Sequence, residues 1–326
     1  MPLLSVRNLV TEFHGRQGVA RAVDDVSFDI EPGEIFGIVG ESGCGKSATC
    51  RSIIKLFGGA RARIAGGSIE MDGVGNLVER PEAKMHEVRG SKISFIFQDP
   101  LTALNPTMRV GRQIAEVILR HGKVSRAEAR ERAVQMLRDV KVTSPERRME
   151  AYPHELSGGL RQRVVIAMAL ALQPPLIIAD EPTTALDVTV QDQILRLLLD
   201  RRAETDTAII MVTHDLGVVA EVCDRVAVMY GGQIVETGTT DEVLHEAAHP
   251  YTRALLAALP SAAMRGRKLT PIEGMPPSLI APPPGCRFAP RCAHAHDACR
   301  AARPPLAPRA GGAPGHRDAC ILDRVQ

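Results

Sequence analysis

The chain has 326 residues, of which 40 are Lys or Arg and 38 are Asp or Glu, so its formal net charge is only +2. This balance excludes binding to nucleic acid or anionic membranes by bulk charge, and an aromatic content of 3% is too low for a platform that stacks several bases. A hydrophobic content of 44% beside 24% charged residues is typical of a globular protein, and the length predicts about two structural units.

The N-terminal sequence and the apolar runs predict a cytosolic location. The start MPLLSVRNL lacks the basic region and apolar core of an export signal. The best apolar run, residues 164–172, stops at Gln173 and two prolines, well short of the roughly 18 residues that cross a bilayer. In a reducing compartment, the seven cysteines are not expected to form a disulfide framework.

Strand-like and helical segments alternate along most of the chain, which predicts an α/β fold with a parallel or mixed sheet. The expected strands cover residues 6–13, 22–30, 35–39, 93–97, 176–179 and 208–212, with a hairpin over 226–236 that turns at Gly231-Gly232. Between about 100 and 155 helical spacing replaces the strand pattern, which predicts an inserted helical subdomain. Ten of the 23 prolines fall between residues 274 and 314, so we expect one domain over 1–260 and a Pro-rich C-terminal extension over 261–326.

Residues 40–47, GESGCGKS, match the pattern G-x-x-x-x-G-K-[ST] between an apolar strand and a helix. The glycines let backbone N–H groups face phosphate oxygens, and the helix start adds the positive end of its dipole. Lys46 is expected to reach the β- and γ-phosphates of a nucleotide, and Ser47 to bind Mg²⁺. The same helix start could lower the pKa of the Cys44 thiol and make nucleotide binding sensitive to oxidation. The expected phosphate-contacting residues are Gly40, Ser42, Gly43, Cys44, Gly45, Lys46 and Ser47.

Further polar residues follow the ends of predicted strands, where ligands bind in parallel sheets. Asp180 is suited to the Mg²⁺ shell, and Glu181 can act as the general base that activates water. Gln98 could contact Mg²⁺ or the attacking water, and His214 could bond a γ-phosphate oxygen. Considered singly, Gln98 and His214 are each more readily explained as an ordinary loop residue.

Residues 156–163, LSGGLRQR, precede an apolar helix and resemble the signature motif of ABC-type ATPases. Together with the motifs above and a D-loop at 184–187 that ends in Asp187, the resemblance covers about residues 1–240. It implies that ATP is sandwiched between two chains, the Ser157-Gly158-Gly159 turn of one facing the γ-phosphate held by the other. Phe13 matches the aromatic residue that stacks on adenine in this family, although simple packing within a strand is the alternative.

Three longer segments, 98–106, 155–170 and 249–260, resemble the D-type ATPase of dipeptide, oligopeptide and nickel importers. The resemblance implies an ATP-hydrolysing subunit that uses ATP and Mg²⁺ and lies peripherally on the cytoplasmic face of the inner membrane. Its implied partners are a second ATPase, for which the family favours a paralogue, two membrane permeases and, indirectly, an extracytoplasmic binding protein, but no nucleic acid. The permease would contact the helical subdomain and the loop after Gln98. The alternatives are a soluble ABC ATPase and an Fe–S redox-gated ATPase that is not dedicated to transport.

Four cysteines in the extension are separated by 5, 6 and 20 residues, without the C-x-x-C spacing of common zinc fingers. Four thiolates could hold Zn²⁺ or a [4Fe–4S] cluster, and nearby arginines would offset the net charge of either. Family resemblance favours the [4Fe–4S] cluster and leaves Zn²⁺ as the alternative. The residues in question are Cys286, Cys292, Cys299 and Cys320, the arginines Arg287, Arg291 and Arg300, and the substitute zinc ligands His294, His296 and His316.

Overall fold

The computed structural model describes residues 1–59, 61–183, 187–258, 271–309, 311–313 and 315–322. The chain forms two compact units: unit 1 comprises Met1–Ile30, Ile35–Glu79 and Thr213–Gln326, and unit 2 comprises Glu31–Glu34 and Arg80–Val212. The domain boundary expected at residue 260 and the D-loop positions 184–186 lie outside the described residues. Within the described ranges, no helix is both long enough and apolar enough to cross a membrane.

Unit 1 contains an antiparallel four-stranded sheet with the order β2-β1-β4-β5. The strands are β1 (Leu4–Gly15), β2 (Gly18–Ile30), β4 (Ala62–Met71) and β5 (Gly75–Asn76). The sequence prediction missed β4, which contains the pair Gly66-Gly67. Gly67 has φ +89°, and a Cβ there would lie 2.5 Å from the carbonyl oxygens of Arg7 and Asn8. Glycine is therefore required for the close approach of β1 at this irregular point of the ladder.

A second, mixed set of strands in unit 1 carries the phosphate loop. The parallel pair β3 (Ile35–Val39) and β9 (Arg225–Tyr230) is extended by β10 (Gln233–Thr239), which runs antiparallel to β9. The predicted hairpin is confirmed, because β9 and β10 are joined at Gly231 and Gly232, whose φ angles are +55° and +85°. Two short C-terminal strands, β12 (Arg317–Asp318) and β11 (Ala307–Pro308), continue the ladder from β10.

The remaining described elements of unit 1 are helical. They are α1 (Lys46–Ile53), α8 (Leu216–Val222), α9 (Thr240–His245), α10 (Pro250–Ala257), the 3-10 turn η4 (Ala289–Arg291) and α11 (Asp297–Ala301).

Unit 2 combines three parallel strands with a group of helices. Its strands are β6 (Ile93–Ile96), β7 (Leu176–Asp180) and β8 (Ala208–Val212), paired in the order β6-β7-β8. Every residue of β7 and β8 is buried, as expected for apolar strands that are covered on both faces. Its helical elements are η1 (Glu82–Glu87), α2 (Pro100–Ala103), α3 (Val110–His121), α4 (Arg126–Asp139), α5 (Pro145–Arg148), η2 (Pro153–Glu155), α6 (Gly158–Leu170) and α7 (Val188–Thr205).

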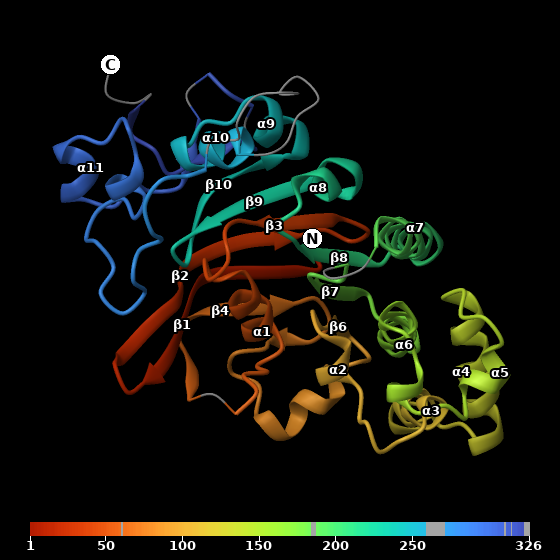
Figure 1. The fold of residues 1–326 in the computed structure, drawn as a ribbon. Coiled ribbons are helices and arrows are strands. Elements are labelled where there is room, and N and C mark those ends of the chain that lie inside the picture. The colour runs from red at the N-terminus through yellow and green to blue at the C-terminus, as the bar shows by residue number, and fades with distance from the viewer. Residues whose placement is uncertain (60, 184–186, 259–270, 310, 314, 323–326) are drawn as a thin grey trace. The chain divides into compact units, whose positions relative to one another are not determined.

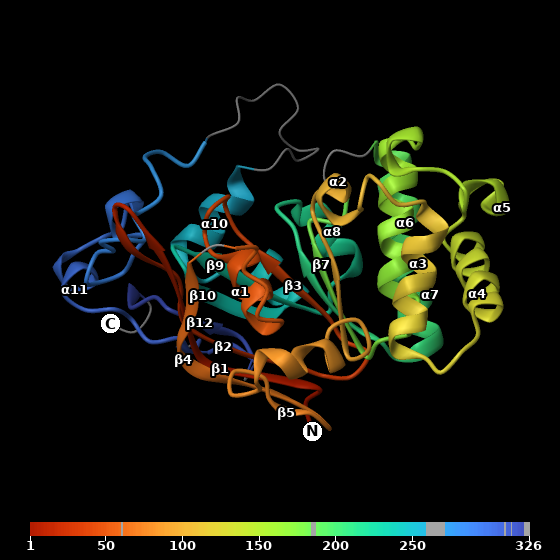
Figure 2. The same ribbon diagram turned by 90° about the horizontal axis from the view of Figure 1, so that it is seen from below.

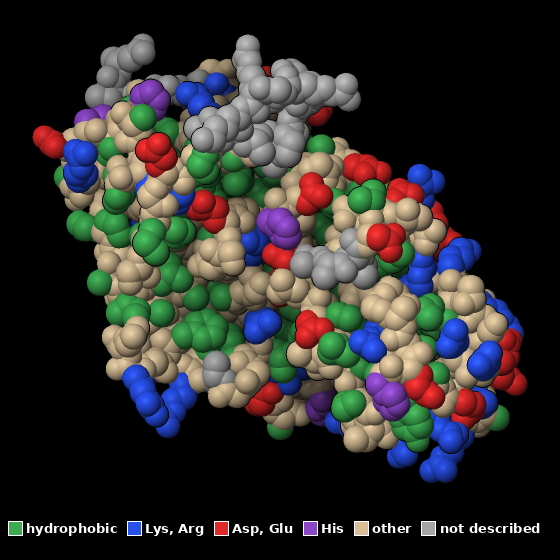
Figure 3. Space-filling view, in the orientation of Figure 1, with side chains coloured by type: hydrophobic (Ala, Val, Ile, Leu, Met, Phe, Trp, Pro, Cys, Tyr) green, Lys and Arg blue, Asp and Glu red, His purple; other side chains and the backbone are tan. Residues whose placement is uncertain are grey.

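Residues 100–155 contain helices and no strand, as the helical spacing predicted. Helices α3, α4 and α6 lie beside one another in both ribbon views (Figures 1 and 2). Ile114 and Ile118 of α3 and Ala133 of α4 are buried, which gives each helix one packed face. On the visible surface of this helical part, basic and acidic side chains are intermixed (Figure 3), and several form ion pairs, such as Arg132 with Glu128.

Candidate functional site

The phosphate loop of unit 1 is held in a conformation that only glycine adopts easily. Gly40, Gly43 and Gly45 have φ angles of +146°, +77° and +109°. A Cβ at Gly40 would lie 2.2 Å from the Met229 carbonyl oxygen, and one at Gly45 would lie 2.3 Å from the Ala22 carbonyl oxygen. The glycines of the motif are thus needed both for chain direction and for close packing against β9 and β2.

Lys46 begins α1, and its ammonium group points back over the loop. The Nζ atom donates to the carbonyl oxygens of Gly40 at 2.7 Å and Glu41 at 3.0 Å. A buried ammonium group that is held over the loop by two of its carbonyl oxygens is suited to a bound phosphate. The expected lowering of the Cys44 thiol pKa was wrong, because burial raises that pKa.

Two other predicted site residues lie in unit 1. Phe13 is half-buried near the end of β1, and its ring meets Phe57 edge-on at a centroid distance of 6.1 Å. His214 is exposed and precedes Asp215, which caps the N-terminus of α8. Both side chains are therefore at least partly accessible to a ligand.

Unit 2 brings Gln98 and Glu181 into direct contact, as expected for residues that follow neighbouring parallel strands. The Gln98 Nε2 atom donates to Glu181 Oε2 at 2.8 Å. Asp180 is the buried last residue of β7. Glu181 has φ +49°, an unusual value for this residue type that is found preferentially at functional sites. The Gln98 amide thus orients a carboxylate whose backbone is also tightly constrained.

The signature segment forms the start of α6. Ser157 is its N-cap, with Oγ accepting from the Leu160 N–H at 3.4 Å, and both Ser157 and Gly158 are exposed. Gly159 is half-buried, and a Cβ there would lie 3.3 Å from Val190. An exposed helix start with two glycines leaves backbone N–H groups open to an anion.

One hydrogen bond links α6 to a neighbouring loop, and another caps the helix that follows in unit 2. Gln162 is buried, and its Nε2 atom donates to the Pro182 carbonyl oxygen at 2.7 Å, which ties α6 to the loop after Glu181. Asp187 caps α7, accepting from the Val190 N–H at 2.9 Å. Of the predicted D-loop, the structure describes Asp187 only.

The four predicted cysteines of the extension lie around one small cavity of about 20 Å³, which His249 and Phe288 also line. The Cys286 N–H donates to the Cys299 carbonyl oxygen at 2.7 Å, so two of the four are also joined through the backbone. Within the described part of the chain, no three or more His, Cys, Asp or Glu side chains are arranged to hold a metal ion. The donors have the right kind and number for a metal or cluster, but a cavity that fits about one water would have to widen.

Burial raises the pKa of the Cys286 and Cys292 thiols, and it raises the pKa of Cys320 to about 11. These thiols are therefore neutral at physiological pH, and a metal would have to displace their protons.

The three arginines near the cysteines do not match the expectation that they offset the charge of a cluster. Instead they pair with carboxylates: Arg287 with Asp24, Arg291 with Glu41 and Arg300 with Asp297. His316 bonds Glu236 at 2.8 Å and is absent from the cavity lining.

Sequence reasoning missed the residues that brace the phosphate loop from the C-terminal side. The Glu41 N–H donates to the hydroxyl of the buried Tyr251 at 2.8 Å. The Glu41 carboxylate accepts two hydrogen bonds from Arg291. Because 210 and 250 residues separate these pairs, no local pattern could have found them.

Comparison with known families agrees with the motifs. Residues 23–184 match the ABC transporter family model, and residues 235–299 match the model of the oligopeptide/dipeptide transporter C-terminal region. Among solved structures, the ATP-binding cassette MJ0796, a dimer in a post-hydrolysis state bound to ADP and Pi, is similar with a TM-score of 0.66. It is 27% identical, covering 73% of this chain and 98% of that one. This similarity confirms the α/β cassette fold with a mixed sheet.

Curated relatives extend the similarity over nearly the full length. The probable peptide ABC transporter ATP-binding protein y4tR of Sinorhizobium fredii is 53% identical, covering 98% of this chain and 94% of the relative. The dipeptide transport ATP-binding protein DppD of Bacillus subtilis is 51% identical, covering 89% of this chain and 86% of the relative. The chain therefore belongs to the family of ATP-binding proteins of peptide ABC transporters.

Proposed function

We propose that this chain hydrolyses ATP to drive an importer of dipeptides or oligopeptides, or of a related cargo such as nickel. The observation that carries the proposal is the contact between Gln98 and Glu181, which presents an oriented carboxylate in a chain that also holds a complete phosphate loop. Identity of about 50% to peptide transport proteins over most of the chain supports the cargo class.

In this proposal the phosphate loop and Lys46 bind the triphosphate, and the half-buried ring of Phe13 stacks on adenine. The hydroxyl of Ser47 and the carboxylate of Asp180 are the hard oxygen ligands that suit Mg²⁺, which would offset the charge of the phosphates. Because the Gln98 amide nitrogen donates to Glu181, its carbonyl oxygen is the atom suited to face the ion. Glu181 takes a proton from the attacking water, and His214 bonds a γ-phosphate oxygen.

The exposed N-terminus of α6 gives the site a second half. Ser157, Gly158 and Gly159 are proposed to cap the γ-phosphate held by a second ATPase subunit, with Asp187 near the same junction. A head-to-tail pair of this kind needs both chains for turnover, which suits a machine that couples closure to hydrolysis.

The permeases are proposed to contact the helical part of unit 2. A groove of about 760 Å³ there is lined by four arginines and two glutamates, among other residues. The charged lining residues are Arg109, Arg112, Arg126, Arg130, Glu116 and Glu150. Such a groove fits a short polar segment of a membrane partner, which would keep this chain peripheral on the cytoplasmic face.

We also propose that the extension over 261–326 holds a [4Fe–4S] cluster on its four cysteines, with Zn²⁺ as the alternative. The meeting of all four thiols at one cavity supports this. Protein purified without oxygen is expected to be brown and to contain iron and acid-labile sulfide. A colourless protein with stoichiometric zinc would exclude the cluster.

The proposed function is tested by uptake of a labelled dipeptide into cells that lack this chain and are complemented with wild type or Lys46→Ala. Wild type is expected to restore uptake, and Lys46→Ala is not, because it loses the ammonium group that binds phosphates. ATP hydrolysis by the purified wild type without any effect on peptide or nickel uptake would instead favour a soluble ABC ATPase. A change in its ATPase rate between oxidised and reduced protein would favour a redox-gated enzyme.

A further inference from the structure

Arg291 of the extension makes a partly buried ion pair with Glu41, the second residue of the phosphate loop. The Arg291 side chain is only 4% exposed. Its two terminal nitrogens donate to the two carboxylate oxygens of Glu41 at 2.7 and 3.0 Å. This is the bidentate geometry that gives arginine–carboxylate pairs both strength and a fixed direction.

The rest of the guanidinium group is equally well held. It donates to the carbonyl oxygens of Ile272 and Glu273 at 3.0 and 2.9 Å, and to the Tyr230 hydroxyl at 3.2 Å. Its centre lies 5.8 Å from the Tyr230 ring centroid and 5.9 Å from that of Phe288. Arg291 is therefore a rigid anchor that the extension builds for Glu41.

The pair matters for nucleotide because of where Glu41 lies. It follows Gly40 directly, and its carbonyl oxygen accepts from Lys46, the residue that is proposed to bind the β- and γ-phosphates. A carboxylate in this loop would repel a triphosphate unless its charge were offset and its direction fixed. Arg291 does both, and Tyr251 fixes the backbone of the same residue.

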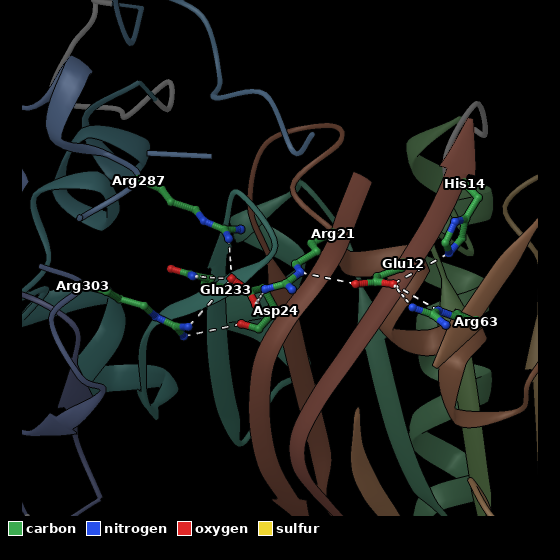
Figure 4. A network of polar contacts seen from close by, with 8 residues as sticks. All are labelled: Glu12, His14, Arg21, Asp24, Arg63, Gln233, Arg287 and Arg303. Atoms are coloured by element: carbon green, nitrogen blue, oxygen red, sulfur yellow. Dashed lines mark hydrogen bonds and ion pairs between the residues drawn. The ribbon is translucent and has the colours of Figure 1, made fainter. Parts of the chain in front are cut away.

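The anchor is joined through the backbone to residues that line the cysteine cavity. Arg291 directly precedes Cys292, and consecutive turns from Cys286 through Phe288 to Arg291 are closed by backbone hydrogen bonds of 3.0 and 2.9 Å. On the same turn, Arg287 donates to the Gly231 carbonyl oxygen. It also bonds the carboxylate of Asp24 in β2, as Figure 4 shows. The segment 286–292, between two of the four thiols, thus contacts the nucleotide-binding part of unit 1 through Arg287 and Arg291.

We propose that Arg291 is a positioning residue for ATP binding: the C-terminal extension neutralises Glu41 and holds it in place, and so sets the affinity of the phosphate loop for nucleotide. This rests on the proposed function as an ATPase. It also gives the extension a role in the nucleotide site without any contact between Arg291 and the ligand.

The test measures the Kd of the full-length protein for the non-hydrolysable analogue AMP-PNP with Mg²⁺ by calorimetry. Arg291→Gln is expected to raise the Kd about tenfold, because it leaves a carboxylate beside a multiply charged ligand. Arg291→Lys keeps the charge but not the bidentate bonds, so a rise of about threefold is expected. The matched control is Arg300→Gln, which removes an exposed ion pair with Asp297 in the same extension and should change the Kd less than about twofold.

A double variant separates positioning from simple loss of structure. Glu41→Gln combined with Arg291→Gln is expected to bind more tightly than Arg291→Gln alone, because the repelling carboxylate is gone. In steady-state assays, Arg291→Gln should raise KM while kcat stays within about twofold.

The inference is overturned if the wild type binds AMP-PNP normally and Arg291→Gln matches it within twofold. It is also overturned if the double variant binds as weakly as Arg291→Gln. Should Arg291→Gln fail to fold, Glu41→Gln alone decides: it is expected to bind at least as tightly as wild type, and binding tenfold weaker would contradict the inference. Failure of the wild type itself to bind AMP-PNP would instead refute the proposed ATPase function.

Discussion

Glu181→Gln is the change that most directly tests the proposed chemistry, since it alters one atom of the reacting carboxylate. The glutamine carbonyl oxygen can still accept the 2.8 Å hydrogen bond from Gln98, and both residue types share the same cost at φ +49°. What is lost is the capacity to take a proton, which as a general base contributes about 10²- to 10⁴-fold. At 1.36 kcal/mol per tenfold, this corresponds to a barrier higher by about 2.7 to 5.4 kcal/mol.

The assay is ATP turnover by the purified subunit with its cognate partner, alongside the Kd for ATP and the melting temperature. We expect the Kd and melting temperature to stay near wild-type values while turnover falls by at least a hundredfold. Gln98→Ala is the comparison variant, because it leaves the carboxylate of Glu181 in place and removes its hydrogen bond, worth about 1.5–3 kcal/mol, together with the oxygen proposed to face Mg²⁺. Turnover of Glu181→Gln within tenfold of wild type would refute the assignment of the base.

Two further predictions concern stability. Gly43→Ala and Gly45→Ala share the cost of a positive φ, about 1–2 kcal/mol, but only Gly45→Ala also brings a Cβ to 2.3 Å from the Ala22 carbonyl oxygen. Urea unfolding should therefore show a clearly larger loss for Gly45→Ala, and equal losses would contradict the structure. Burial lowers the pKa of His249 to about 3, so the folded state resists its protonation and stability should fall as pH drops from 6.5 towards 3. His249→Asn, which can still cap the Tyr251 N–H, should flatten that acid limb in melting experiments, and an unchanged pH profile would refute the cause.

Features written in short stretches of sequence could be predicted. The phosphate loop needs glycine at set positions next to Lys46, and the residues of its motif fall within eight positions. That Gln98 and Glu181 lie at one edge followed from a single rule, that parallel strands end at the same edge of a sheet, whereas their hydrogen bond was not predicted. The gathering of four cysteines was likewise expected, because they cluster within the last 41 residues of the sequence.

Features that depend on distant partners could not be predicted. Strand β4 was hidden because Gly66 and Gly67 break the strand pattern, and the need for glycine at position 67 is explained only by the approach of β1. Arg291 looked like one of several charges beside a metal site, whereas its actual partner, Glu41, lies 250 residues away. The raised pKa of Cys44 reflects burial of the thiol in the folded chain, and this outweighs the lowering effect of the neighbouring Lys46.

The bond from Gln162 to the Pro182 carbonyl oxygen has a consequence for paired subunits. In the head-to-tail arrangement proposed above, α6 begins at the partner's nucleotide, whereas Glu181 acts on the nucleotide held by its own chain. One buried hydrogen bond of 2.7 Å therefore mechanically tethers two separate reaction centres. In this arrangement, a shift of the loop after Glu181 when phosphate leaves is transmitted through this hydrogen bond to α6, which closes the opposite centre. The bond therefore provides a physical connection by which one centre can influence the other.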